Sequence, residues 1–282
     1  MLLTKYYICV IITITKGVEN MASLYAISDI HGRYDLLKDI IDTHIHFEQN
    51  DKLVLLGDYV DGQYAKQSYQ TLDYIYHLQQ KYPDQVYVLC GNHDYWLSCY
   101  LNNSASELET TLSAEFETLQ SFMDEDEFNE IYNHAMKTSD NRYSILDSMY
   151  ISCRNLIYNR YTDLIQWLSK LPYYLETENQ IYVHAGIVQD EKYWKEFSTI
   201  NTYLMKYPPE YDSFYKTVIA GHISTYSMSQ SYRIYRYKDN IYLDSSVEES
   251  KCLNLLKYNF HNHKYTGIIK EGYQWIEYEL GE

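Results

Sequence analysis

Residues 52–61 of this chain read Lys-Leu-Val-Leu-Leu-Gly-Asp-Tyr-Val-Asp, an apolar run that ends in a glycine and two aspartates. The run has the composition of a buried strand, and its glycine marks the turn that follows. Similar polar signatures come after other apolar runs: Asp29-Ile30-His31-Gly32, Gly91-Asn92-His93-Asp94, His184-Ala185-Gly186, Gly221-His222 and Leu243-Asp244. Because ligand sites gather at the carboxyl ends of parallel strands, we expect these polar residues to meet in one crevice.

The apolar spacing alternates between strand and helix in the N-terminal third. Residues 23–28, 52–56 and 85–90 are typical of strands, whereas residues 34–43 and 68–79 have helical spacing. This order predicts a parallel sheet with crossover helices. Later strands are expected to have short connections and to be more antiparallel, over residues 180–183, 217–220, 241–243, 253–258 and 273–278. The predicted fold class is α/β, a sandwich of two mixed β-sheets flanked by helices.

The middle of the chain predicts a helical cap insertion over about residues 95–171. One apolar stripe at helical spacing comprises Leu108, Leu112, Phe116, Leu119 and Met123. More helix is expected around residues 126–136 and 162–170, and the acidic run 124–127 is interpreted as a solvated helix face or loop. We therefore expect a single domain over residues 21–282 that carries this cap.

The first twenty residues are interpreted separately. Residues 6–15 are apolar and flanked by lysines, but they are too few to span a membrane. The codons of residues 16–18 can form a purine-rich sequence like a ribosome-binding site, shortly before Met21. We therefore expect residues 1–20 to be a leader translated from upstream sequence.

The composition limits the partners. A formal net charge of -16 repels nucleic acid backbones, so we expect no polymeric nucleic acid partner, and we expect no membrane association. The five cysteines are odd in number and include no Cys-X-X-Cys pair, which favours a reducing, cytoplasmic setting.

The residue types at the strand ends are those of a metal site. In an extended segment, Asp29 and His31 point to the same side and suit one ion, and the two oxygens of Asp58 can bridge two ions. The remaining candidate ligands are Asn92, His184 and His222. Such a mixed nitrogen and oxygen set suits Mn²⁺, Fe or Zn²⁺ better than Ca²⁺, without choosing among the three.

The order of these motifs resembles the metallophosphoesterase (calcineurin-like) superfamily. The resemblance is closest to the phosphoprotein phosphatase family and its bacterial relatives, which include symmetrical diadenosine tetraphosphate hydrolases. That family has Asp-X-His-Gly, Gly-Asp-X-X-Asp-Arg-Gly, Gly-Asn-His-Asp/Glu, His-Gly/Ala-Gly and Gly-His in this order. The match covers roughly residues 22–245 and implies the metallo-dependent phosphatase fold.

The resemblance also implies the roles of the site residues. The first of two divalent ions would be held by Asp29, His31 and Asp58. The second would be held by Asp58, Asn92, His184 and His222. His93 would be the general acid, held and charged by Asp61.

One element of the family pattern is missing. Gly62-Gln63 stands where the family has Arg-Gly. An arginine at this place normally binds two oxygens of the substrate phosphate through two parallel hydrogen bonds. The second phosphate-binding arginine is absent too, because residues 187–197 contain lysines but no arginine. Arg33 is our candidate substitute as substrate-binding residue, and the alternatives are Arg142, Arg154 and Arg160.

Four functions fit these features to different degrees. The leading interpretation is a phosphoprotein phosphatase that acts on phosphoserine, phosphothreonine or phosphotyrosine. The alternatives are a dinucleoside polyphosphate hydrolase, a phosphodiesterase or nuclease, and a binding module that has kept only the metal site. The negative charge argues against a polymeric nucleic acid substrate, and the complete ligand set argues against an inactive module.

Overall fold

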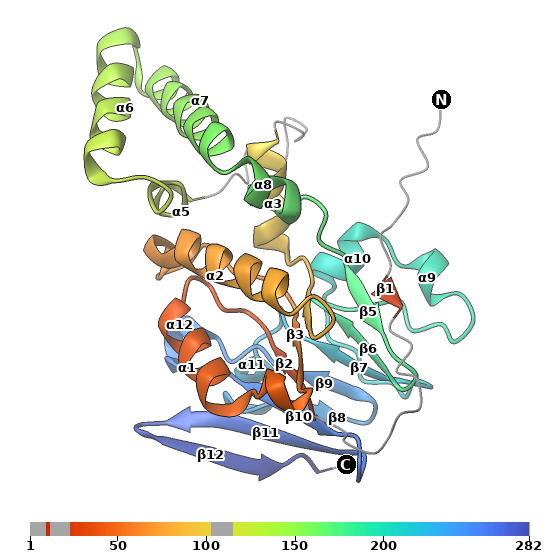
Figure 1. Cartoon of the computed structure of the whole chain (residues 1–282). Coiled ribbons are helices and arrows are strands. Elements are labelled where there is room, and N and C mark those ends of the chain that lie inside the picture. Colours follow the sequence, from red (N-terminus) through yellow and green to blue (C-terminus); the bar gives the residue numbers. More distant parts are fainter. Residues whose placement is uncertain (1–9, 12–22, 103–114, 282) are drawn as a thin grey trace.

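The computed structural model describes residues 10–11, 23–102 and 115–281, and these form two six-stranded sheets packed face to face (Figure 1). The first sheet has the order β12-β11-β10-β2-β3-β4, and the second has the order β1-β5-β6-β7-β9-β8. The first sheet contains β2 (Ser23–Ile27), β3 (Lys52–Leu55), β4 (Val86–Val88), β10 (Leu255–Asn259), β11 (Lys264–Glu271) and β12 (Gln274–Glu279). The second contains β1 (Val10–Ile11), β5 (Tyr174–Glu176), β6 (Gln180–Val183), β7 (Thr217–Ala220), β8 (Tyr235–Tyr237) and β9 (Asn240–Tyr242).

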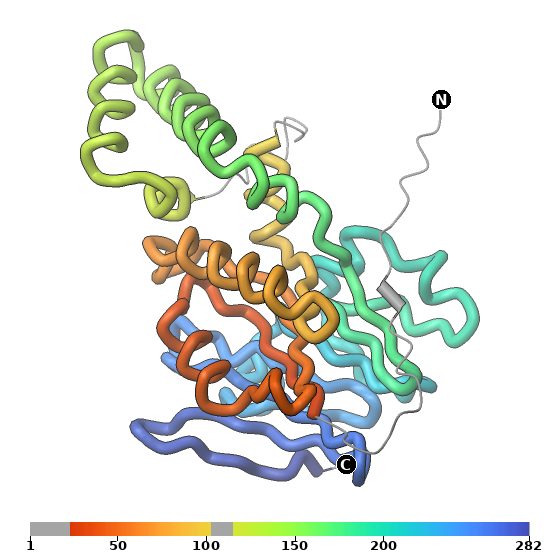
Figure 2. The backbone as a smooth tube through the Cα atoms, in the orientation of Figure 1, coloured from red at the N-terminus to blue at the C-terminus, as the bar shows by residue number. Residues whose placement is uncertain are grey.

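The strand directions agree with the prediction in the first sheet and correct it in the second. Strands β2, β3 and β4 are parallel, as the strand–helix alternation predicts. Strands β6, β7 and β9 are also parallel, so the expectation of antiparallel pairing is wrong for them. Parallel neighbours need a long connection, and residues 184–216 supply one between β6 and β7. Strands β2 and β10 are far apart in the sequence but pair antiparallel, so a red and a blue segment lie side by side in Figure 2.

The core follows from the two-residue period of the strands. Leu24 and Ala26 of β2 face the second sheet and pack in a cluster with Tyr182 of β6. Tyr25 and Ile27 point to the opposite face, into the core beneath the helices. Because successive side chains of a strand point to opposite faces, one apolar strand supplies both layers.

Helices cover the outer faces of the sandwich (Figure 1). Three long ones are α1 (Tyr34–His44), α2 (Ser68–Lys81) and α3 (Asn92–Leu101), of which α3 begins shortly after β4. The short ones are η2 (Phe47–Gln49), η3 (Ala65–Gln67), α9 (Trp194–Phe197), α10 (Ile200–Met205), α11 (Thr225–Ser229) and α12 (Val247–Ser250). In the segments that the structure describes, no helix is both long and apolar enough to cross a membrane.

The middle region is helical where it is described. It contains α5 (Phe116–Gln120), α6 (Glu125–Thr138), α7 (Arg142–Arg160) and α8 (Thr162–Leu168). Figure 1 shows that the α6–α7 hairpin extends away from the sheets, whereas α5 and α8 lie close to α2. The helices expected around residues 126–136 and 162–170 are confirmed as α6 and α8. The acidic run begins α6, where the carboxylate of Asp124 accepts a hydrogen bond from the backbone N–H of Glu127.

Two expectations fall on parts that are not described. Leu108 and Leu112 of the predicted apolar stripe lie outside the described residues, whereas Leu119 of the same stripe is buried in α5. Of the expected leader, the structure describes only Val10–Ile11, which pair parallel with residues 175–176 of β5. The rest of residues 1–20 lies outside the described residues.

Candidate metal centre

The predicted ligands all follow strands that run parallel to a neighbour, namely β2, β3 and β4 of the first sheet and β6 and β7 of the second. They are Asp29, His31, Asp58, Asn92, His184 and His222. Since the two sheets face each other, their carboxyl ends bring these side chains together at one edge of the sandwich.

One group of ligand atoms comes from the first sheet. Donor atoms of Asp29, His31 and Asp58 all lie within 4.8 Å of one another. Nδ1 of His31 lies 3.1 Å from the carbonyl oxygen of Val60, which can only accept, so Nδ1 carries the proton. That hydrogen bond leaves Nε2, 3.8 Å from Oδ2 of Asp58, as an unprotonated donor for a metal.

A second group joins the two sheets. Donor atoms of Asp58, His184 and His222 also lie within 4.8 Å of one another, so Asp58 belongs to both groups. Nε2 of His184 lies 2.9 Å from Oδ1 of Asn92, which places the carboxamide beside this group. The structure thus brings together all six predicted ligands in two overlapping sets.

The backbone around the centre is held in an uncommon conformation. Positive φ angles occur at Asp29 (54°), His31 (44°), Asp58 (56°), Asp61 (67°) and His222 (64°). Residues with a Cβ adopt such angles rarely, and they gather where function requires a particular backbone path. Here the turns after β2 and β3 interlock, because the N–H of Asp29 donates to the carbonyl of Gly57 at 3.1 Å and that of His31 donates to Asp58 at 2.9 Å.

Asp94 fixes the turn after β3 against the turn after β4. Its buried carboxylate accepts hydrogen bonds from the backbone N–H groups of Asp58 (2.7 Å), Tyr59 (3.0 Å) and Gly91 (2.9 Å). The two turns touch so closely at Gly57, whose φ is 114°, that a Cβ there would collide with the backbone of Gly91. Asp94 therefore holds the peptide that carries Asp58.

The electrostatics of the centre fit divalent cations. Burial raises the pKa of Asp29 to about 6 and that of the neighbouring Asp244 to about 8. Burial also opposes the charge on Asp58, but His184 and His93 beside it outweigh burial and hold the pKa of Asp58 well below its usual range. Burying adjacent carboxylates is costly unless positive charge neutralises them. The carboxylate, imidazole and carboxamide donors are those that Mn²⁺, Fe and Zn²⁺ bind, so the residues fit two such ions.

His93 and Asp61 form a pair next to the ligands. Nδ1 of His93 lies 2.9 Å from Oδ2 of Asp61, and the other oxygen of Asp61 accepts a hydrogen bond from the hydroxyl of Thr118. The His93 ring packs edgewise against the rings of Trp96 and His31, with distances between ring centroids of 4.9 and 5.1 Å, respectively. Burial lowers the pKa of His93, but Asp58 and Asp61 outweigh it and raise the pKa to about 9.

Carboxylates occupy the place of the missing arginine. The backbone N–H of Gly62 donates to Glu115 at 3.2 Å, and that of Gln63 donates to Glu248 at 2.5 Å. Gly62 has a φ of 82°, and a Cβ there would collide with the carboxylate of Glu248. An arginine at this position is therefore incompatible with the observed place of Glu248.

Two of the candidate substitute arginines, Arg33 and Arg160, bind carboxylates of this chain. The guanidinium of Arg33 binds the carboxylate of Asp35 through two hydrogen bonds of 3.0 and 3.1 Å, and it lies 4.4 Å from the ring of Tyr64. Arg160 binds Glu127 of α6. The substrate-binding role of Arg33 stays a prediction.

Four residues at the site were not predicted from the sequence, and only one of them belongs to a sequence motif. Asp94 belongs to the Gly91-Asn92-His93-Asp94 signature, so its place in the motif was a usable signal. Thr118, Glu115 and Glu248 lie in segments without a motif, and only the fold brings them to the site.

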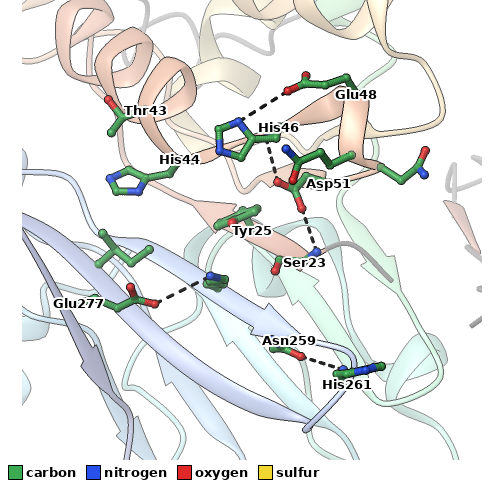
Figure 3. A pocket seen from close by; sticks show the side chains of 14 residues that line it. Ser23, Tyr25, Thr43, His44, His46, Glu48, Asp51, Asn259, His261 and Glu277 are labelled. Carbon is green, nitrogen blue, oxygen red and sulfur yellow. Dashed lines mark hydrogen bonds and ion pairs between the residues drawn. The ribbon is translucent and has the colours of Figure 1, made fainter. Parts of the chain in front are cut away.

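A separate polar hollow lies at the other end of β2 (Figure 3). It has a volume of about 840 Å³ and is lined by Ser23, His44, His46, Asp51 and other polar residues. The carboxylate of Asp51 accepts hydrogen bonds from the backbone N–H groups of Ser23 (2.9 Å) and His46 (2.8 Å). Asp51 thus stabilises the chain path around β2 and is remote from the metal centre.

Comparison with known proteins identifies the family. The sequence profile of the calcineurin-like phosphoesterases matches residues 22–259, which is most of the chain. The chain belongs to this family. Two Caenorhabditis elegans proteins named as serine/threonine-protein phosphatases, one of them PP1-delta, are each 36% identical to it over 76 and 66 residues. The alignments cover 27% and 23% of this chain, and the chain spans about a fifth of the length of these relatives (20% and 21%).

Solved structures share the fold. A Saccharomyces cerevisiae serine/threonine phosphatase with similarity to human PP5 has a TM-score of 0.56 at 11% identity, covering 97% of this chain and 84% of the other. A protein described as a diadenosine tetraphosphatase has a TM-score of 0.52 at 18% identity, covering 95% and 100%. The two mixed sheets flanked by helices are therefore the metallophosphoesterase fold, as predicted.

Proposed function

We propose that this phosphoesterase is a phosphoprotein phosphatase that hydrolyses phosphoserine, phosphothreonine or phosphotyrosine, with His93 as the general acid. The observation that carries the proposal is the hydrogen bond of 2.9 Å between Nδ1 of His93 and Oδ2 of Asp61, directly beside the shared ligand Asp58. A metal site alone would suit a binding module, whereas a positioned acid next to it suits catalysis.

The two ions would be held as the two overlapping groups suggest. Asp29, His31 and Asp58 would hold the first, and the second would be held by Asp58, Asn92, His184 and His222. When bound, a pair of divalent ions supplies an activated water as the nucleophile and neutralises phosphoryl charge. Mn²⁺, Fe and Zn²⁺ are the ions that we propose from the donor chemistry.

The protein's own residues would supply the proton for the leaving group. Asp61 accepts the Nδ1 proton of His93, so the ring is held in one orientation with Nε2 on the other side, available to donate. The backbone N–H of His93 also donates to Oδ1 of Asp58 at 3.0 Å. Hydrogen bonds therefore connect His93 with both Asp61 and Asp58, and they would keep the proton donor at a fixed distance from the phosphoryl site.

Two features support a phosphoprotein substrate over a polyphosphate. The relatives with 36% local identity are named as serine/threonine-protein phosphatases. In addition, the family pattern has an arginine where Gly62 and Gln63 contact two carboxylates, Glu115 and Glu248, and one ammonium group, that of Lys251, so the net charge there is negative. Like charges there would disfavour a substrate with several adjacent phosphates.

A dinucleoside polyphosphate hydrolase is the second candidate. It is supported by the structural likeness along the full length of a protein described as a diadenosine tetraphosphatase. A phosphodiesterase is the third candidate. A diester phosphate carries a single negative charge, so its binding depends less on an arginine that forms two hydrogen bonds to the phosphate.

A substrate panel tests these candidates. The protein is reconstituted with Mn²⁺, and kcat/KM is compared for phosphoserine, phosphothreonine and phosphotyrosine peptides, diadenosine tetraphosphate and bis-para-nitrophenyl phosphate. We expect the highest kcat/KM on a phosphopeptide, with no turnover by Asp58→Ala. A higher kcat/KM on diadenosine tetraphosphate or on the diester would replace the proposal by the corresponding alternative.

We further propose a cytoplasmic setting. Among the described residues, Cys90, Cys153 and Cys252 are free thiols. Free thiols are typical of a reducing compartment, which supports this setting.

A further inference from the structure

A residue of the helical region reaches the catalytic pair. Thr118 of α5 is completely buried, and its hydroxyl donates a hydrogen bond to Oδ1 of Asp61. The other oxygen of Asp61, Oδ2, bonds to Nδ1 of His93 at 2.9 Å. The two oxygens of one carboxylate thus connect α5 with the proposed general acid.

The hydroxyl of Thr118 has a defined direction. Oγ of Ser68 accepts a hydrogen bond from the backbone N–H of Asp61 at 3.2 Å and lies 3.4 Å from Oγ1 of Thr118. Because the hydroxyl of Thr118 donates its proton to Asp61, Ser68 is the donor in the contact between the two hydroxyls. The hydrogen bonds thus run in one direction, from the hydroxyl of Ser68 to that of Thr118 and from Thr118 to the carboxylate of Asp61.

Helix α5 is anchored independently of this contact. The backbone N–H of Tyr69, in the first turn of α2, donates to Oγ of Ser121 at 3.0 Å. Leu119 and Phe122 are buried in the main core. Contacts other than the Thr118 hydroxyl therefore also hold this helix in place.

We propose that Thr118 is a positioning residue for proton donation by His93, an inference that rests on the proposed acid role of His93. A carboxylate with one hydrogen-bond partner can rotate about its Cβ–Cγ bond and take the imidazole with it. Fixing Oδ1 through Thr118 sets the plane of the carboxylate and therefore the direction of the His93 ring. The helical region then contributes to catalysis through Asp61, and not only as a cover.

The test uses the leaving group as its readout. Thr118→Val keeps the shape of the side chain and removes the hydroxyl, whereas Thr118→Ser keeps the hydroxyl. Phenyl phosphate needs a proton on its leaving oxygen, and 2,4-dinitrophenyl phosphate does not. We expect Thr118→Val to lower kcat on phenyl phosphate by about tenfold or more while kcat on 2,4-dinitrophenyl phosphate changes less than about twofold. Thr118→Ser should retain most of both activities.

A matched control separates positioning from general loosening. Ser121→Ala removes two hydrogen bonds, one from the backbone N–H of Tyr69 and one to the backbone carbonyl of Thr118 (2.6 Å). It keeps the hydroxyl of Thr118 that donates to Asp61, so it should leave the ratio of the two activities unchanged. If the valine variant fails to fold in a thermal melt, Thr118→Ala removes the hydroxyl without crowding and serves in its place. Equal losses on both substrates, or no loss on either, would overturn the proposal.

His93→Asn distinguishes a failure of this inference from a failure of the proposed function. If His93→Asn produces the leaving-group split and the hydroxyl-free Thr118 variant does not, His93 is the acid and Thr118 does not position it. If His93→Asn itself shows no split, the acid role on which the inference rests is wrong.

Discussion

Oδ2 of Asp58 lies 3.4 Å from Nε2 of His184, although the two residues follow strands of different sheets. The candidate metal centre is therefore a junction between the halves of the sandwich. An ion held by Asp58, His184 and His222 would contact both sheets in the folded state only, so metal binding and folding are coupled.

Metal removal is expected to destabilise the protein. At a free ion concentration of about a hundred times Kd, binding adds about 2.7 kcal/mol to the free energy of unfolding. We expect EDTA to lower the Tm of the Mn²⁺-loaded protein, as measured by calorimetry. Asp58→Ala should abolish this dependence on metal, whereas Asp42→Ala, on the exposed face of α1, should retain it. An equal effect of EDTA on the wild type and on Asp58→Ala would contradict the assignment of Asp58.

His93→Asn is expected to separate catalysis from metal binding. The asparagine cannot donate an acidic proton, so kcat on phenyl phosphate should fall by about 10²–10⁴-fold. The backbone N–H that donates to Asp58 is unchanged by the substitution, so the metal content measured by mass spectrometry should be the same. Loss of metal together with activity would mean that His93 acts as a ligand.

The pH profile should depend on Asp61. Burial lowers the pKa of His93, and the carboxylates of Asp58 and Asp61 raise it to about 9, so His93 is protonated below that pH and loses its proton above it. Activity that needs the protonated form is then present at neutral pH and is lost as the pH rises through about 9. Asp61→Asn removes one of the charges that raise the pKa of His93, so the alkaline limb of kcat/KM should move to lower pH. A limb that stays in place would assign it to another group.

Asp94→Ala should cost stability as well as activity. The substitution leaves three buried backbone N–H groups without their acceptor, and each such group costs about 1–3 kcal/mol. We expect the free energy of unfolding in urea to fall by about 3 kcal/mol or more. Asp124→Ala, which removes an exposed acceptor at the start of α6, is the matched control and should cost about 1 kcal/mol. Equal costs for the two variants would show that Asp94 is not a structural acceptor.

The strand-end motifs made the centre predictable from the sequence. Each motif follows an apolar run, and parallel strands deliver their carboxyl ends to one edge, so proximity of Asp58 to His184 follows once both strands are recognised. Strand β11 was not predicted, because Gly267 interrupts its apolar pattern. In the structure the ring of Tyr278 on β12 covers this glycine and takes the space where a Cβ would lie.

Contacts between distant segments could not be predicted in the same way. Thr118 and Asp61 are 57 residues apart, and a threonine in a short amphipathic helix carries no signal of its partner. Glu248 likewise reaches Gln63 over 185 residues. Both pairs depend on where tertiary packing places a helix, which neither propensity nor periodicity encodes.

Glu248 is expected to tune the substrate charge that the site accepts. Glu248→Gln keeps an oxygen for the backbone N–H of Gln63 and removes the negative charge, so the loop around Gly62 should keep its shape. A partly exposed charge contributes about 0.2–1 kcal/mol, so KM for diadenosine tetraphosphate should fall by about 1.4-fold to fivefold. KM for para-nitrophenyl phosphate should change less, since that substrate carries a single phosphate.

Glu249→Gln removes an exposed charge from the same short helix and should leave both KM values unchanged. The difference between the variants should shrink in about 1 M salt, where the Debye length is about 3 Å. If both variants lowered KM equally, overall charge would explain the effect, and the contact of Glu248 with Gln63 would not determine substrate choice.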